Sequence, residues 1–357
     1  MNTDVVIHTE IFPCNSDQST SKFDETSDRN TKSLLSEIFQ RTYCVRNESA
    51  GENSVLRLVI DSLIFHPGMC CTTVERMIQQ QTQKDDTERY KETRLLGSGE
   101  ISEVYLATDT YLQNHLVTLK KIKKEKLNPI LRKKLNTEIA ILKRIAAIPA
   151  DCFVQLLDVL EDSEHVYLVM EYIEGNELFD LVDQFPYGVP EVLCMKILRQ
   201  IFVAIAHLHR NNIAHRDLKL ENILYNATTE QIKVIDFGFA STTENKLEDY
   251  CGSIHYISPQ ILNKVPFDGK KADVWALGVI SFALLAVKFP FDDENDNQSN
   301  IFFQIRRGLF DVPAHFSNLA RSFVEELLNP NEDARPSVED CLDHPFLSQL
   351  LSRDHVL

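Results

Sequence analysis

The chain has 357 residues, which is long enough for a two-lobed domain with an extension, because single domains usually run ~50–250 residues. Hydrophobic residues make up 43% of the chain, enough for a sizeable core. The formal net charge of -16 argues against a general nucleic-acid binder, which normally carries a basic footprint. It suits a partner that carries positive charge, such as a basic peptide.

Cysteine usage and the start of the chain indicate the compartment. The 8 cysteines are scattered and include no C-x-x-C pair, which indicates reduced thiols in a cytoplasmic and/or nuclear protein. The first residues include Asp4 and lack a basic stretch, so we expect no signal peptide. No apolar run approaches the ~18 residues needed to span a bilayer, so we expect no membrane partner.

The first part of the chain differs in composition from the rest. Residues 1–53 are rich in Ser, Thr, Asp and Asn, and such a stretch buries too little apolar surface to offset chain entropy, so we expect a largely disordered extension. Residues 54–66 are mostly apolar. This segment is expected either to dock on the domain that follows it or to bind a partner. The polar run that ends at residue 88 indicates a linker, so residues 54–89 are interpreted as an apolar segment followed by a polar linker.

From Tyr90 onward, short apolar runs typical of strands alternate with longer stretches of helical spacing. The predicted strands cover residues 93–96, 103–108, 115–122, 154–160 and 166–171. The predicted helices cover residues 131–145, 189–210 and 271–287. The last of these is apolar enough to be a buried central helix.

A glycine loop over residues 96–104 separates the first two predicted strands and contains Gly97 and Gly99. Glycines let the backbone approach phosphates closely and present its N–H groups to them. Taken alone, this pattern is also that of a plain hairpin. The interpretation of this loop as a phosphate-binding loop therefore depends on the motifs that follow it.

Two polar motifs in the second half of the chain carry the chemistry. The run His-Arg-Asp-Leu-Lys-Leu-Glu-Asn ends at Asn222, and Asp-Phe-Gly begins at Asp236. The first motif supplies a proton acceptor, Asp217, a cation that can face a phosphate, Lys219, and an amide that can bind a metal. Phosphoryl transfer from a magnesium nucleotide needs this set, because the protein's part in that reaction is mostly positioning and charge stabilisation.

The two motifs and their order resemble the eukaryotic serine/threonine protein kinase family, and the resemblance runs from about Tyr90 to Leu347. The segments that begin with Cys-Gly-Ser at Cys251 and Pro-Phe-Asp-Asp at Pro290 are similar to the calmodulin-dependent and AMP-activated kinase branch.

The resemblance implies an α+β, two-lobed protein-kinase fold over residues 90–347. A small β-rich N-lobe with one helix would cover residues 90–170, and a larger helical C-lobe would cover residues 174–347. A short C-terminal tail over residues 348–357 would follow. The family uses ATP and Mg²⁺, which are therefore the expected cofactors.

The resemblance also assigns roles at the reacting end of the site. Asp217 would accept the proton of the substrate hydroxyl, and Lys219 would neutralise charge on the moving phosphate. Asn222 and Asp236 would hold Mg²⁺, a hard cation that prefers oxygen ligands. A lysine two residues after the catalytic aspartate is typical of serine/threonine kinases.

Roles in nucleotide binding follow in the same way. Lys120 would reach the α- and β-phosphates, and Glu138 in the next predicted helix would pair with it. Thr118 stands where the family usually has alanine, and its branched side chain would narrow the roof over the adenine. The other implied contacts come from the glycine loop, the back of the pocket, the hinge and the floor: Leu96, Gly97, Ser98, Gly99, Val104, Met170, Glu171, Ile173 and Leu224.

Three further residues match family positions that face the protein substrate. Glu177 and Glu221 correspond to carboxylates that bind an arginine upstream of the target residue in many kinases, although either could be a plain surface carboxylate. Ser253 would close the site by bonding Asp217 and Lys219. A protein substrate with a Ser or Thr target in a basic context is therefore expected.

The activation segment departs from the family pattern. Many kinases of this branch carry a phosphorylated threonine two residues before Cys-Gly-Ser/Thr, and this chain has Asp249 there. A phosphate orders the segment by pairing with cations, and Arg216 is the expected cation here. Asp249 is therefore predicted to order the segment without an upstream kinase. In the alternative, Asp249 is a solvated carboxylate and the switch is one of three hydroxyl residues: Ser241, Thr242 or Thr243.

These features predict an active serine/threonine protein kinase that can act without phosphorylation of its activation segment. The alternative is a pseudokinase that works as a scaffold or allosteric partner. Its support is limited to Ser102, Thr118 and Gln260, none of which is a catalytic group. Gln260 replaces the glutamate that usually pairs with an arginine matching Arg335, so we expect that ion pair to be absent.

Overall fold

The computed structural model describes residues 89–243, 245–249 and 251–353. The chain divides into two compact units, and all of these residues belong to the second, Lys84–Leu357. The predicted extension over residues 1–53 and the predicted apolar segment over residues 54–66 lie outside the described residues.

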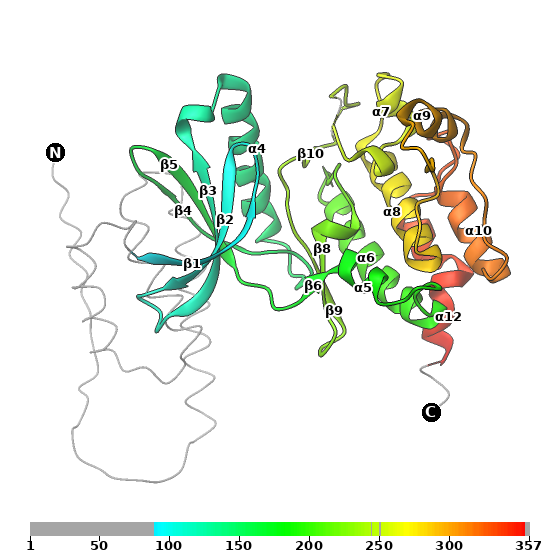
Figure 1. Cartoon of the computed structure of the whole chain (residues 1–357), viewed down its shortest axis with the longest axis horizontal. Helices are drawn as coiled ribbons and strands as arrows, with labels where there is room; N and C mark the ends of the chain where they lie inside the picture. Colours follow the sequence, from blue (N-terminus) through cyan, green and yellow to red (C-terminus); the bar gives the residue numbers. More distant parts are fainter. Residues whose placement is uncertain (1–88, 244, 250, 354–357) are drawn as a thin grey trace, which may run out of the picture. The chain divides into compact units, whose positions relative to one another are not determined.

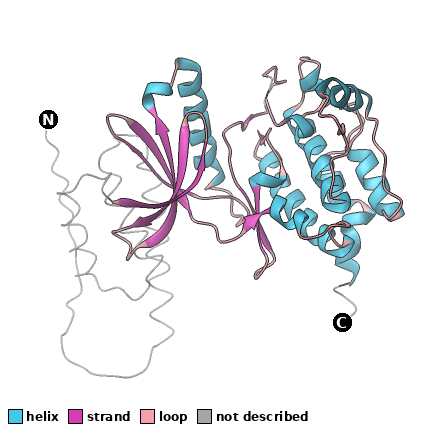
Figure 2. Cartoon of the chain, in the orientation of Figure 1, coloured by secondary structure: helices cyan, strands magenta, loops and turns pink. Residues whose placement is uncertain are grey.

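The small lobe is one antiparallel sheet of five strands in the order β1-β2-β3-β5-β4 (Figures 1 and 2). Its strands are β1 (Tyr90–Ser98), β2 (Ser102–Asp109), β3 (His115–Lys123), β4 (Leu156–Glu161) and β5 (His165–Glu171). Along β3, Val117 and Leu119 are buried in a small apolar cluster with Val169 of β5. Because side chains alternate along a strand, Thr118 and Lys120 lie on the opposite face, where the predicted nucleotide site is expected.

The small lobe also contains one long helix, α4 (Pro129–Ile145), which lies beside the sheet in Figure 1. The helix begins with Asn128, whose side chain accepts a hydrogen bond from the Leu131 amide at 2.9 Å, and with a proline at its first position. Its buried residues recur every three or four positions: Leu135, Glu138, Ile141, Leu142 and Ile145. Glu138 is the polar member of this face.

The large lobe is mainly helical (Figure 2). Its helices are α5 (Leu178–Asp183), α6 (Glu191–Arg210), α7 (Pro259–Leu262), α8 (Gly269–Ala286), α9 (Gln298–Arg307), α10 (Asn318–Leu327), α11 (Val338–Asp343) and α12 (Pro345–Arg353). Short strands carry the loops of the predicted site: β6 (Asn176–Glu177), β7 (Ile213–Ala214), β8 (Ile223–Asn226), β9 (Gln231–Val234) and β10 (Ser241–Thr242). Short 3-10 turns cover Lys124–Lys126, Leu220–Asn222 and Ile254–Tyr256.

Helix α8 is the centre of the large lobe, and it is buried along almost its whole length. Asp268 caps its first turn by accepting the Lys270 amide at 2.8 Å. Its last turn ends at Val287, which has a left-handed φ of 55°. Among the described helices, α6 alone is long and apolar enough to cross a membrane, but 61% of its most apolar window is buried inside the domain. We therefore interpret α6 as a core helix of the domain.

The α+β fold and the predicted strands and helices are confirmed, with ends that differ by at most three residues. Helices α5, α7 and α9–α12 and the short strands and turns were not predicted, and the two- to four-residue elements among them leave no periodic pattern. Helix α12 continues past Leu347 to Arg353, so the predicted tail begins inside a helix.

Candidate active site

The loop that carries Asp217 is held by one buried carboxylate of α8. Asp273 is 1% exposed and accepts the backbone N–H groups of His215 at 2.9 Å and Arg216 at 2.8 Å. It also contacts His209 Nε2 at 2.9 Å. Arg216 has a left-handed φ of 67°, which is unfavourable for a residue with a side chain, so these bonds fix a strained turn. Asp273 was not predicted, although a carboxylate in an otherwise apolar helix is a usable signal.

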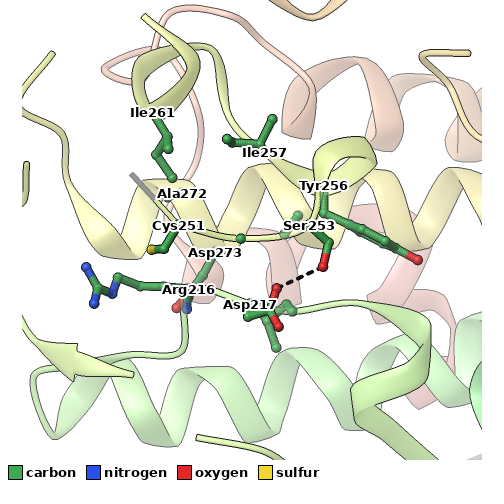
Figure 3. A pocket seen from close by; sticks show the side chains of 12 residues that line it. Arg216, Asp217, Cys251, Ser253, Tyr256, Ile257, Ile261, Ala272 and Asp273 are labelled. Atoms are coloured by element: carbon green, nitrogen blue, oxygen red, sulfur yellow. Dashed lines mark hydrogen bonds between the residues drawn. The ribbon is translucent and has the colours of Figure 1, made fainter. Parts of the chain in front are cut away.

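Three side chains converge on Asp217: two from the same loop, Lys219 and Asn222, and Ser253 from the activation segment. Asn222 Nδ2 donates to the Asp217 carbonyl at 2.8 Å and to its Oδ2 at 3.2 Å. Lys219 Nζ lies 3.6 Å from Asp217 Oδ2. Ser253 Oγ donates to Asp217 Oδ1 at 3.1 Å (Figure 3) and accepts from Lys219 Nζ at 3.4 Å. The predicted bonds of Ser253 to both residues are therefore present.

A small pocket lies beside Asp217, under the activation segment (Figure 3). Arg216 and Ser253 line it, together with Cys251 and Tyr256 from the activation segment. Tyr256 also accepts the backbone N–H of Leu220 at 3.3 Å. The activation segment and the catalytic loop are thus bonded to each other at Asp217, at Lys219 and at Leu220.

The charged residues of the two lobes meet at Lys120. Its Nζ lies 2.6 Å from Glu138 Oε1 on α4 and 3.8 Å from Asp236 Oδ1. Burial would lower the pKa of Lys120, but the two carboxylates outweigh burial and raise it. Burial would likewise raise the pKa of Asp236, but Lys120 and the Gly238 amide lower it. Both groups are therefore charged at neutral pH.

Asp236 and Asn222 fit a magnesium ion by the chemistry of their donors. Asp236 offers a partly exposed carboxylate, and its backbone has a left-handed φ of 58°. Asn222 uses its amide nitrogen toward Asp217, so its amide oxygen is the atom left for a cation. Oxygen ligands of this kind suit Mg²⁺, which usually takes one or two carboxylates together with substrate phosphates.

Phe237 connects this region to the core. It is 1% exposed, and its ring centroid lies 5.0 Å from that of His215. Leu142 of α4 and Leu156 of β4 are buried in the same apolar cluster as Phe237. Leu142, Leu156, His215 and Phe237 are thus all buried.

The glycine loop joins β1 to β2. The Gly99 amide donates to the Ser102 carbonyl at 2.7 Å, which closes the turn. A Cβ added at Gly97 would meet no protein atom within 4 Å. Packing within the domain therefore does not require glycine at this position, whereas close approach of a phosphate to the backbone does.

A family model described as "Protein kinase domain" matches residues 90–347. The chain belongs to the protein kinase family. The resemblance seen in the sequence is therefore confirmed.

Several proteins named as kinases are similar to this kinase domain. Mitosis inducer protein kinase cdr1 of Schizosaccharomyces pombe is 39% identical over 225 residues, which are 62% of this chain and 37% of that protein. Calcium/calmodulin-dependent protein kinase type 1 of Caenorhabditis elegans is 35% identical over 269 residues, 73% of this chain and 75% of that protein. CBL-interacting protein kinase 10 of Oryza sativa is 33% identical over 273 residues, 75% of this chain and 58% of that protein. The chain spans 37% and 30% of two of its similar relatives, from Schizosaccharomyces pombe and Dictyostelium discoideum.

In this kinase domain the residues expected around the adenine lie on β3, β5 and β8. Thr118 of β3 is paired with Met170 of β5, and Lys120 is paired with Val104 of β2. Leu224 lies half-buried on β8. The structure thus brings the predicted roof and back of the slot together on neighbouring strands.

The hinge carries an ion pair that was not predicted. Glu171 Oε1 accepts the Gln155 amide at 3.0 Å and lies 2.8 Å from Lys233 Nζ of β9. Lys233 also lies 2.6 Å from Asp151 Oδ1. The hinge is therefore tied to the strand that precedes Asp236, while Ile173 follows it in the connection between the lobes.

The two carboxylates expected to face the substrate lie near each other. Glu177 belongs to β6, which pairs with β8, and Glu221 lies in the 3-10 turn before β8. Partial burial, with help from Asp180 and Glu221, raises the pKa of Glu177, and Lys219 opposes this. Close carboxylates repel each other, so a cation between them would be favourable.

The activation segment places Asp249 beside Arg216, as expected. Asp249 Oδ2 lies 3.7 Å from Arg216 Nη1, and the two side chains are 80% and 8% exposed. Arg216 Nε donates to the Phe239 carbonyl at 2.7 Å, whereas its buried Nη1 makes no hydrogen bond within the described residues. The ammonium of Lys134 lies over the Phe239 ring, 5.6 Å from its centroid. The largely buried guanidinium of Arg216 thus faces the exposed carboxylate of Asp249.

Proposed function

We propose that this chain is an active kinase that transfers the γ-phosphate of ATP to Ser or Thr hydroxyls of proteins. One observation carries the proposal: Lys120 is paired with both Glu138 and Asp236, so the groups that hold the nucleotide are assembled together. A pseudokinase would not need these three charged groups to be assembled. Ser102, Thr118 and Gln260, which favour that alternative, leave every one of these contacts in place.

Each side chain of the candidate active site would have a separate role in the reaction. Asp217 would orient the substrate hydroxyl and accept its proton, and Asn222 and Ser253 hold that carboxylate in place. Lys219, 3.6 Å away, would offset charge on the moving phosphate. Mg²⁺, when bound by Asn222 and Asp236, would neutralise charge on the phosphates of ATP.

Transfer of labelled phosphate from ATP to a generic basic protein substrate tests the proposal. The purified chain should label the substrate, and Asp217→Asn, which keeps the side-chain shape, should not. Equal and negligible labelling by the two proteins under conditions where a known kinase works would favour the pseudokinase alternative.

We further propose that the substrate carries arginine about three residues before its target hydroxyl. Glu177 and Glu221 support this, because two nearby carboxylates can bind one guanidinium with more directional contacts than they can an ammonium. The net charge of -16 favours basic partners in the same sense.

We also propose that Asp249 substitutes for activation-segment phosphorylation. It brings one permanent negative charge to Arg216, where a phosphate would bring ~1.5–2. Because Asp249 is 80% exposed, the contact is screened by solvent. The segment should therefore be ordered, but less firmly than by a phosphate.

Treatment of bacterially produced enzyme with phosphatase tests this proposal. The treated enzyme should keep most of its activity, and Asp249→Ala should lower it by up to ~5-fold, the upper range for an exposed pair. Asp249→Glu is the matched control, because it keeps the charge. Loss of nearly all activity on phosphatase treatment, with Asp249→Ala harmless beforehand, would refute the proposal.

A further inference from the structure

Beyond the site, the activation segment is attached to the large lobe at a second place. Leu247 and Phe267 exchange backbone hydrogen bonds of 2.9 and 3.0 Å. Beside this bridge, a Cβ added at Gly269 would lie 2.9 Å from Leu247 Cδ1 and 2.9 Å from Ala214 Cβ. Glycine at the start of α8 therefore leaves the space into which Leu247 packs.

One ion pair accompanies the bridge. Lys246 Nζ lies 2.8 Å from Glu332 Oε1, and the second oxygen of Glu332 accepts the Asp268 amide at 3.2 Å. The Lys246 side chain is 60% exposed, but that of Glu332 is only 11% exposed. A surface pair alone contributes little, but here one partner is a buried carboxylate already fixed by a backbone amide.

Glu332 also lies beside the cation left without its family partner. Arg335 is 2% exposed, and its amide donates to the Glu332 carbonyl at 3.3 Å. Its guanidinium donates to the neutral Gln260, where a kinase normally has glutamate. Burial lowers the pKa of Arg335, and among the groups that counteract this effect Glu332 contributes most. Of the carboxylates around Arg335, Glu332 thus has the strongest electrostatic effect on its guanidinium.

We propose that Glu332 is a positioning residue that serves two neighbours. It supplies the negative charge missing beside Arg335, and through Lys246 it holds the activation segment against the start of α8. In this arrangement two nearby ion pairs anchor the segment: Asp249 with Arg216 and Lys246 with Glu332. The inference deepens the proposed phosphate-independent activity, and depends on that proposal only for its activity readout.

Hydrogen exchange of the activation segment and thermal unfolding together test the two roles. Lys246→Met should make amides of residues 245–249 exchange ~2- to 5-fold faster while leaving the melting temperature unchanged within ~1 °C. Lys246→Arg should keep the protection. Lys143→Met on α4, a change at another exposed lysine, is the matched control and should alter neither quantity.

Glu332→Gln should change both quantities: faster exchange of the segment and a melting temperature lower by several degrees. Adding Gln260→Glu to Glu332→Gln should restore the melting temperature, because a carboxylate again faces Arg335, but should not restore protection of the segment. In kinetic assays, Lys246→Met should raise the KM for a peptide substrate and leave the KM for ATP unchanged.

Unchanged exchange in both Lys246→Met and Glu332→Gln would overturn the proposal, as would recovery of both quantities in the double variant. If Glu332→Gln does not fold, the comparison of Met and Arg at position 246 still decides the anchoring role. If the wild-type chain shows no kinase activity, the proposed function fails, but exchange and melting still test Glu332.

Discussion

Replacing Gln260 by glutamate should stabilise the folded kinase domain. Arg335 lies buried beside Gln260, with no carboxylate of the described residues in direct contact. Its guanidinium is also bonded to the Lys271 carbonyl and lies 5.5 Å from the centroid of the Trp275 ring. Burial lowers the pKa of Arg335 to about 10, from an ordinary value of 12.5. The folded state therefore disfavours the charged form of this residue.

The size of the effect follows from this difference. One pKa unit corresponds to ~1.4 kcal/mol, so burial destabilises the cation by ~3 kcal/mol. Because the pKa of a base is depressed in the folded state, this cost is present in full below about pH 10 and disappears only as the pH rises further. The substitution Gln260→Glu also removes the 2.7 Å hydrogen bond that Gln260 Nε2 donates to the Pro330 carbonyl. Such a bond contributes ~1 kcal/mol, which leaves a net gain of ~1–2 kcal/mol, or ~2–8 °C in a domain of this size.

Thermal unfolding followed by circular dichroism measures this gain, which should be the same from about pH 6 to about pH 8. Gln260→Met is the uncharged control and should not stabilise the domain. In a double-mutant cycle with Arg335→Gln, the gain from glutamate should vanish. An unchanged or lower melting temperature for Gln260→Glu would show that the bond to Pro330 outweighs the charge, and would refute this reasoning.

Four further variants test the site. Lys120→Met and Asp236→Ala should each lower turnover by roughly 10³-fold or more, because each removes a charge that holds nucleotide or metal, while circular dichroism shows an intact fold; near-normal turnover would contradict the site. Glu177→Gln with Glu221→Gln should flatten the preference for arginine in a peptide library without changing the KM for ATP, and an unaltered profile would exclude these carboxylates. Thr118→Ala should lower the KM for ATP by ~2- to 10-fold by widening the slot, with Thr118→Val, of similar size, as control; equal values would show that the slot is not limiting.

Features encoded by neighbouring residues could be predicted from the sequence. The short apolar run over residues 115–122 predicted β3, and helical spacing predicted α4 and α8 with ends close to those observed. The catalytic residues lie in two short motifs, so their order along the chain was enough to indicate the site. Family resemblance added the pairing of Lys120 with Glu138, which are 18 residues apart.

Contacts between distant charged residues could not be predicted in this way. Lys233 and Glu171 are 62 residues apart, and Lys246 and Glu332 are 86 apart. Single lysines and glutamates in loops have no period, and their ordinary role is to face solvent. Only the fold shows that Glu332 is buried next to Arg335, and that the charge absent at Gln260 has a nearby substitute.

Helix α8 positions the catalytic loop through Asp273, which accepts a hydrogen bond from the strained backbone of Arg216. The packing of the large lobe and the geometry of the reaction therefore rest on the same helix. A substitution that loosens α8 slightly would let that turn relax before the domain unfolds, so heat would remove activity earlier than structure. Temperature-sensitive alleles of this gene should accordingly gather along α8 rather than around the glycine loop.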